Sequence, residues 1–259
     1  MIMKAVIIVL LVLGGIVFVS KKLGLNETEI KENVPIDDTS RVDLLYKVDD
    51  STFPEQWVNS EIDAQVEEID SAEFEKNKTF MEKALSKYPL SVLRKHLNRV
   101  YIFQNMTFYG LGYGGTYYEN TVYVVLSEYD DYFIEESFHH EFSSVLLESN
   151  PSFLNKKAWK ACNELDYWDE SGGVNALNGR SSEEFDASLH EKGFLHEYAT
   201  TDMENDLNSF AEHMFSGTKE FYAVCENYPK LKKKFKLAVE FYSKLDPAMN
   251  EEFFLRFRK

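Results

Sequence analysis

The chain has 259 residues, which is enough for one sizeable hydrophobic core. Hydrophobic residues make up 44% of it and aromatic residues 15%, which argues for a folded globular protein rather than a disordered one. The formal net charge of −16 at pH 7 argues against binding to nucleic acid or to an anionic membrane surface, because both need clustered positive charge. One basic cluster, at 230–236, departs from this pattern, and we interpret it as the solvated face of a helix.

Residues 5–19 are wholly apolar or glycine, and lysines flank them on both sides. We therefore predict that residues 1–22 form an N-terminal membrane anchor or a secretory signal, since about 20 apolar residues span a bilayer. The anchor is favoured because residues 18–20 fit a signal cleavage site poorly, and a buried core helix is the remaining alternative. Either targeting segment implies a membrane-bound or secreted protein whose acidic domain is exported.

Residues 23–60 are polar and acidic with little periodicity, so we predict a linker that leads to a domain at 61–259. At the start of this domain, apolar side chains recur at helical spacing over 62–88 and over 90–97. Both stretches are predicted to be helices, and the first ends before Pro89 because the residue before a proline disfavours the helical conformation.

Two later stretches, 99–108 and 121–126, are rich in β-branched and aromatic residues and are predicted to be strands. Between them lies a glycine-rich segment, YGLGYGGTYYEN. It lacks the GK[ST] ending of a phosphate-binding loop and leads into a strand rather than a helix. We therefore predict a hairpin turn beside an edge strand.

The remainder of the chain is mostly helical in pattern, and residues 169–188 are predicted to be a surface loop. The predicted helices are 130–148, 155–168, 206–215 and 221–242. The expected fold class is α+β, with a small mixed or antiparallel sheet packed against a bundle of helices.

The chain contains two cysteines, Cys162 and Cys225. An exported domain allows one disulfide between them, and two buried thiols are the alternative. Their spacing does not fit a zinc knuckle, so neither is a candidate metal ligand.

The helix predicted at 130–148 carries the sequence HHEFSS. A zinc hydrolase of the HExxH type needs two imidazoles one helical turn apart, with a glutamate beside the first to polarise the metal-bound water. His140 and Glu141 supply the first imidazole and the base, but Ser144 stands where the second imidazole is needed. His139 does not repair the motif, because Ser143 stands four residues after it.

Further motifs surround this helix. A GG-x-Y strand (114–117) precedes it, and a GF-x-x-x-YA segment (193–199) and a helix with FAE (210–212) follow. Together they resemble the catalytic domains of gluzincin-type zincins, in particular zinc-binding metallopeptidases and lethal-factor-type peptidases. The resemblance spans about residues 90–220 and implies a zincin-like fold, a zinc cofactor and a peptide or protein substrate.

The resemblance also implies roles for individual residues. His140 matches the first zinc ligand and Glu141 the catalytic base. Tyr198 matches a tyrosine that stabilises the oxyanion of the tetrahedral intermediate. The strand at 117–126 matches the edge strand on which an extended peptide lies by strand addition. Glu212 matches a glutamate that usually orients a ligand histidine.

Two ligand positions of the family are altered. Ser144 replaces the second histidine, and Asn208 replaces an acidic ligand on the second helix. Both are poor zinc ligands, so His140, Ser144, Asn208 and Glu212 together predict an atypical metal site. Three alternatives remain: the site recruits other groups as ligands, it holds a harder or more weakly bound cation, or it holds no metal. The candidate replacement ligands are Glu136, His139, Asp206, Glu212 and His213.

The leading functional prediction is therefore a metallopeptidase-like protein with an atypical metal site, in which Glu141 activates a water for attack on a peptide carbonyl. The first alternative is a catalytically inactive zincin-fold module that binds peptide or protein along its edge strand. The second is a structural cell-envelope protein in which the histidine and acid cluster holds two helices together.

Overall fold

The computed structural model describes residues 42–126, 133–168 and 182–259. The predicted anchor or signal at 1–22 lies outside these residues, as do 130–132 of one predicted helix and 169–181 of the predicted loop. Within the described ranges, no helix is both long and apolar enough to cross a membrane.

A mixed six-stranded sheet forms one layer of the described chain, with the strand order β1-β3-β6-β5. β3 runs parallel to β1 and β6, whereas β5 is antiparallel to β6, and β2 and β4 both pair with β3. The strands are β1 (Asp43–Leu45), β2 (Gln65–Glu68), β3 (Arg99–Phe108), β4 (Leu111–Gly112), β5 (Gly115–Tyr118) and β6 (Thr121–Val125). The two strands predicted from the sequence, at 99–108 and 121–126, are thus confirmed as β3 and β6.

The two central strands, β3 and β6, contribute buried side chains to both faces of the sheet, since successive side chains of a strand point to opposite sides. Val100 and Ile102 of β3, with Val122 and Val124 of β6, contact the main core of helices. The other face carries a second, aromatic cluster. Its buried members are Phe53, Tyr101, Phe103, Met106, Phe108, Tyr123 and Val125.

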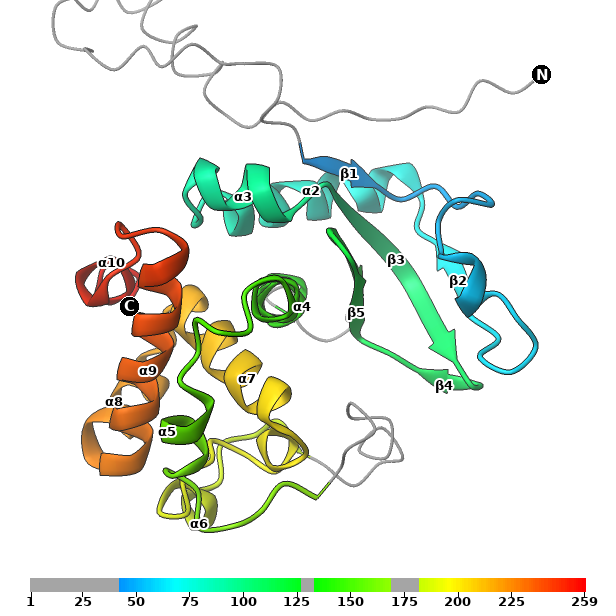
Figure 1. Cartoon of the computed structure of the whole chain (residues 1–259). Helices are drawn as coiled ribbons and strands as arrows, with labels where there is room; N and C mark the ends of the chain where they lie inside the picture. The colour runs from blue at the N-terminus through cyan, green and yellow to red at the C-terminus, as the bar shows by residue number, and fades with distance from the viewer. Residues whose placement is uncertain (1–41, 127–132, 169–181) are drawn as a thin grey trace, which may run out of the picture.

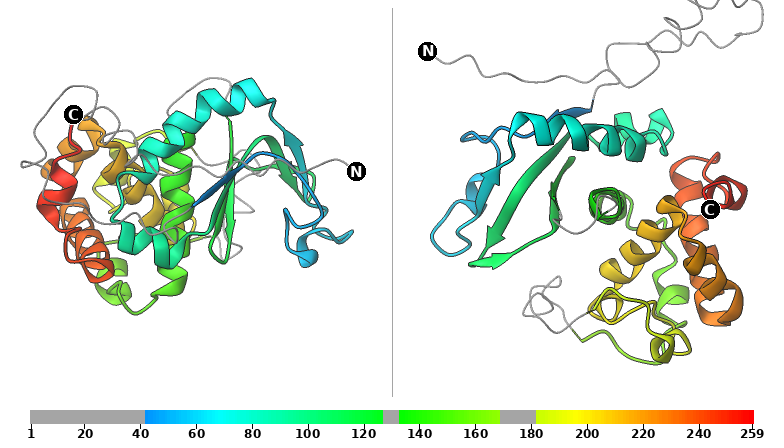
Figure 2. Two further views of the ribbon diagram at one scale, coloured as in Figure 1. Left: turned by 90° about the horizontal axis from the view of Figure 1, so that it is seen from above. Right: turned by 180° about the vertical axis from the view of Figure 1, so that it is seen from behind.

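The helices lie on one side of this sheet (Figures 1 and 2). They are α2 (Ser71–Leu85), α3 (Leu90–His96), α4 (Phe133–Ser149), α5 (Lys156–Lys160), α6 (Ala187–His190), α7 (Met203–Ser216), α8 (Lys219–Asn227), α9 (Pro229–Leu245) and α10 (Glu251–Leu255). Two 3-10 turns, Glu55–Trp57 and Tyr198–Thr200, complete the described elements, and the first packs on the aromatic face of the sheet. α4 is the central helix: it packs on β5 and β6 on one side and on α7 on the other (Figure 1). This arrangement confirms the predicted α+β fold class.

The described part of the predicted linker belongs to the domain. β1 pairs in parallel with β3, and Leu44 is only 1% exposed. Further along, Phe53 is buried against the aromatic face of the sheet, and the Trp57 ring packs 5.2 Å from that of Phe108. The predicted domain start at residue 61 is therefore wrong: the folded domain already includes residue 42. The sequence pattern did not reveal this earlier domain start, because a three-residue strand and scattered aromatic residues show no periodicity.

Three predicted helices have different bounds in the structure. The first begins only at Ser71, after β2, where the Asp70 side chain accepts hydrogen bonds from the backbone of Ala72 and Glu73. The stretch at 155–168 is helical only over α5, and the stretch at 221–242 is divided into α8 and α9 at Pro229, which occupies the first turn of α9.

The basic cluster at 230–236 is not wholly a solvated face. Lys234 is fully buried, and its ammonium group donates hydrogen bonds to the carboxylate of Asp206 on α7 and to the carbonyl of Gly193. The same Asp206 oxygen accepts from Trp159 Nε1 at 2.8 Å and from the Tyr167 hydroxyl at 2.6 Å. These contacts fix α7 to α9, to α5 and to the segment that follows α5.

The two cysteines are buried and unpaired. Cys162 lies beyond the end of α5, and Cys225 lies on α8. Of the two alternatives, the structure therefore contains buried thiols rather than a disulfide.

Candidate functional site

A cavity of about 360 Å³ lies between the strand β5, the helix α4 and the helix α7. Tyr198 and Glu183 also line it. It is strongly acidic, because among the described residues five carboxylates line it together with one histidine, His140. The carboxylates are Glu136, Glu141, Glu183, Glu204 and Glu212.

The helical period places the site residues on one side of α4. His140, Glu141 and Ser144 face the cavity, whereas Phe138 and Phe142 are fully buried in the core. These three polar residues, which the sequence analysis assigned to one site, line the same cavity.

Glu141 lies against the edge strand. A Cβ atom placed on Gly115 would approach Glu141 Oε1 to 2.7 Å, so any larger residue at this position would have to displace the Glu141 side chain. Burial raises the pKa of Glu141 to about 7; the positive charge of His140 opposes this shift, and the charge of Glu204 adds to it. A carboxylate with this pKa suits a general base at neutral pH.

His140 forms a hydrogen-bonded pair with Glu212 of α7, through Nδ1 of the imidazole and Oε1 of the carboxylate. Burial lowers the pKa of His140, but the hydrogen bond and charge of Glu212 outweigh it and raise the pKa to about 10. This bond fixes the orientation of the imidazole and leaves the Nε2 side of the ring for other partners.

Ser144 and Asn208 hydrogen-bond to each other. Asn208 Nδ2 donates to Ser144 Oγ at 2.7 Å, and both side chains are buried. Asn208 Oδ1 has no hydrogen-bond partner among the described residues. The positions of two expected zinc ligands are thus held by a neutral pair joined by one hydrogen bond. The set of His140, Ser144 and Asn208 does not fit the nitrogen and carboxylate donors that zinc prefers.

Tyr198 lies beside the imidazole, with its ring centroid 5.9 Å from that of His140. Burial raises the pKa of Tyr198 well above its ordinary value, and the charge of Glu141 adds to this effect. The phenol therefore stays protonated, and its hydroxyl is available as a hydrogen-bond donor in the cavity that Tyr198 lines.

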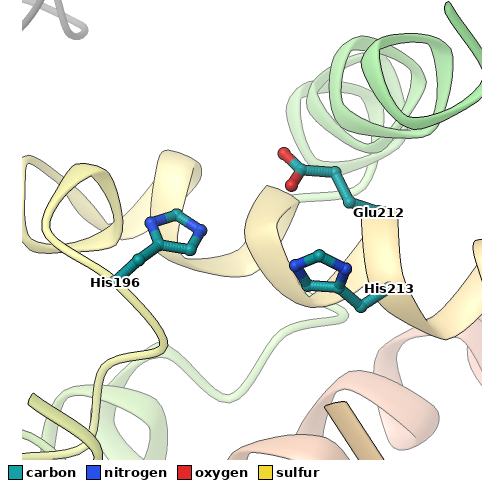
Figure 3. Close-up of side chains that lie close together, drawn as sticks. All are labelled: His196, Glu212 and His213. Carbon is teal, nitrogen blue, oxygen red and sulfur yellow. The ribbon is translucent and has the colours of Figure 1, made fainter. Parts of the chain in front are cut away.

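A group of possible ligands that the sequence did not predict as a set lies next to Glu212. One ligating atom each of His196, Glu212 and His213 falls within 4.8 Å of the others (Figure 3). Burial lowers the pKa of His196 to about 4 and also lowers that of His213. His213 was among the candidate replacement ligands, but His196 was not, because its proximity to α7 is tertiary and no local spacing signals it.

The remaining candidate replacement ligands lie in different parts of the structure. Glu136 lines the cavity, and its Oε1 is 3.9 Å from His213 Nδ1. His139 points into the core, where its Nδ1 is 3.0 Å from the Tyr88 hydroxyl. Asp206 is held by Lys234. His139 and Asp206 are therefore structural, and predicting them as possible ligands was wrong.

The predicted edge strand at 117–126 is corrected by the sheet order. β6 is an interior strand between β3 and β5, and β5 is the edge beside the cavity. Tyr117 and Tyr118 belong to this edge strand, whereas Thr121 to Val125 do not.

Comparison with known proteins finds no matching family model and no matching curated protein. Among solved structures, the chain is similar to one from Bacteroides caccae described as a "putative zinc-binding metallo-peptidase". The two share 12% sequence identity with a TM-score of 0.54, over 84% of this chain and 86% of that chain. At that identity the likeness concerns the fold alone, and it agrees with the zincin-like α+β fold that the sequence predicted.

Proposed function

We propose that this protein is a metallopeptidase-like protein that binds an extended peptide or protein segment in the acidic cavity. The observation that carries the proposal is that the edge strand β5 and the pair His140–Glu141 line the same cavity. β5 pairs with β6 on one side, and no other described strand pairs with its second side. An unpaired strand edge offers backbone hydrogen bonds to an incoming strand.

The negative charge of the cavity favours a positively charged peptide as its ligand. Its carboxylates outnumber its one histidine, and His140 is already paired with Glu212. Complementary charge speeds association and selects partners. The preferred segment therefore carries lysine or arginine side chains.

The test is fluorescence anisotropy of the full chain with labelled peptides of about six residues, the length of an ordinary strand. Lysine-rich peptides should bind at least about tenfold more tightly than glutamate-rich ones of the same length. Gly115→Val should abolish this binding, because its side chain would displace Glu141. Gly112→Val is the matched control, since nothing lies within 4 Å of a Cβ at Gly112. Equal binding of both peptides, or equal effects of both variants, would contradict the proposal.

A second candidate function is peptide hydrolysis, favoured by the pKa of about 7 for Glu141 and by the protonated Tyr198 beside it. Glu141 would act as the base toward water, and Tyr198 would stabilise the oxyanion. Any hydrolysis of a bound peptide should be abolished by Glu141→Gln while peptide affinity is retained. Activity that survives this change would remove Glu141 from the mechanism.

We also propose that residues 1–22 anchor the exported domain to a membrane. The support is the apolar run at 5–19. Membrane fractionation of cells that express the full chain tests this proposal, with a chain lacking residues 1–22 as the control. Recovery of both chains in the same soluble fraction would contradict it.

A further inference from the structure

We propose that a divalent transition-metal ion binds between His196, Glu212 and His213, at a site separate from the His140–Ser144–Asn208 frame. Glu212 and His213 are neighbours on α7, and His196 lies in the segment just before the turn Tyr198–Thr200. Figure 3 shows the two imidazoles facing each other, with the Glu212 carboxylate beside them.

Two unpartnered nitrogens support the site. Nε2 of His196 and Nε2 of His213 are both buried and lack a hydrogen-bond partner in the part of the chain that the structure describes. Buried polar atoms are nearly always partnered, so each such atom needs an explanation. One ion between the two rings would satisfy both nitrogens at once.

The spacing is compatible with an ion. Bonds of about 2.0–2.1 Å around a tetrahedral zinc ion place donor atoms roughly 3.4 Å apart. The three ligating atoms lie within 4.8 Å of one another, so shifts of about 1 Å or less in these side chains would bring them to that spacing. Two imidazoles and one carboxylate favour zinc, cobalt or nickel over calcium or magnesium, which prefer oxygen donors.

Neighbouring groups hold the ligands in place, as is usual around bound metals. His213 Nδ1 is 3.3 Å from Thr218 Oγ1, and the Phe185 ring packs at 4.7 Å from the His213 ring. Glu212 is held through its bond to His140. Glu212 lines the cavity and the two histidines do not, so the ion would lie behind Glu212 as seen from the cavity.

Binding requires one proton to move. His196 Nδ1 accepts a hydrogen bond of 3.2 Å from the backbone amide of Ala199, so neutral His196 carries its proton on Nε2. When Nε2 binds the ion, this proton transfers to Nδ1 through solvent, and the bond to the Ala199 amide is lost. The amide of Ala199 therefore reports metal binding independently of any substitution.

The site has a consequence for the cavity. The ion would tie the segment that carries Tyr198 to α7, which carries Glu212. Metal binding should therefore order the Tyr198 side of the cavity and strengthen peptide binding there, without the metal touching the peptide. The metal site itself does not depend on the proposed peptide binding.

The test is zinc titration of the purified full chain, with metal content measured by elemental analysis and affinity by competition with a zinc indicator. Wild type should bind about one equivalent, and His196→Ala and His213→Ala should each weaken binding by more than about a hundredfold. His140→Ala should weaken it by about ten- to a hundredfold, the usual effect of losing a group that holds a ligand. His96→Ala, a buried histidine on α3, is the control and should leave affinity unchanged.

Two results would overturn the proposal: no bound zinc, cobalt or nickel in the wild type at micromolar metal, or binding that His140→Ala abolishes and His213→Ala spares. If a variant fails to fold, two measurements on wild type replace it. X-ray absorption should find two imidazoles at about 2.0–2.1 Å from bound zinc. The NMR resonance of the Ala199 amide should shift when zinc is added. Finding only one imidazole ligand by X-ray absorption, or no shift of the Ala199 amide resonance, would contradict the site.

Discussion

Ser144 and Asn208 form a buried neutral pair where the resemblance to metallopeptidases implies zinc ligands. The sequence predicted that both positions depart from the family, and it predicted that their helices share one site. It could not predict that the two side chains bond to each other, since that depends on how closely α4 and α7 pack. The bond joins α4 to α7 through a buried polar contact.

This pair makes a prediction for stability. Ser144→Ala leaves Asn208 Nδ2 buried without its acceptor, which should lower the free energy of unfolding by about 1–3 kcal/mol. The double change Ser144→Ala with Asn208→Leu should recover much of that loss, because removing both partners leaves no unsatisfied group. Urea unfolding of the two single variants and the double variant measures the coupling. Strictly additive losses would show that the bond contributes nothing.

Glu141 makes a prediction about pH. Its pKa is raised to about 7 in the folded protein, from an ordinary value near 4.5. The folded state therefore holds the proton more tightly, so its contribution to stability is complete below about pH 4.5 and is lost as pH rises to about 7. Glu141→Gln mimics the protonated acid and should raise the free energy of unfolding on the order of 2–3 kcal/mol at pH 8.

The measurement is urea unfolding of wild type and Glu141→Gln at pH 4.5 and pH 8. The gain should be large at pH 8 and small at pH 4.5. Glu148→Gln serves as the control, because Glu148 is an exposed acid on the same helix. An equal effect of Glu141→Gln at both pH values would contradict the raised pKa.

At the scale of elements, helix periodicity and end signals predicted α4 and α7 well. α7 begins where the Asp202 side chain accepts from the Asn205 amide at 2.8 Å, and it ends at Gly217, whose φ of 77° is in the left-handed region. Short elements were predicted poorly. β5 has four half-buried residues, so it lacks the alternation that identifies a strand.

At the scale of elements, the buried contact between Lys234 of α9 and Asp206 of α7 leads to a prediction about the free energy of unfolding. Lys234→Met leaves the Asp206 carboxylate buried without its cation, which should cost about 3–5 kcal/mol of unfolding free energy. Trp159 and Tyr167 still donate to Asp206 and limit the loss. Lys233→Met, an exposed neighbour on α9, should change stability by less than about 0.5 kcal/mol. Thermal unfolding of both variants checks this, and equal melting temperatures would contradict a buried ion pair.

At the scale of the whole molecule, the α+β class followed from the sequence because strand-like and helix-like patterns occupy separate stretches. The full set of residues that line the cavity could not be predicted from the sequence. Three of its lining residues lie far from α4 along the sequence: Glu183, Tyr198 and Glu212. Their convergence on the cavity depends on how the sheet and the two helices pack. For the same reason, His196 was not recognised as a partner of Glu212 and His213.

The central claim is that the cavity beside β5 takes an extended peptide, and hydrogen exchange tests it most directly. A lysine-rich peptide that adds a strand to the free edge should slow exchange of those amides of β5 that do not pair with β6, while amides of the interior strand β3 stay unchanged. Saturating peptide that leaves exchange of Gly115–Tyr118 unaltered would contradict the account.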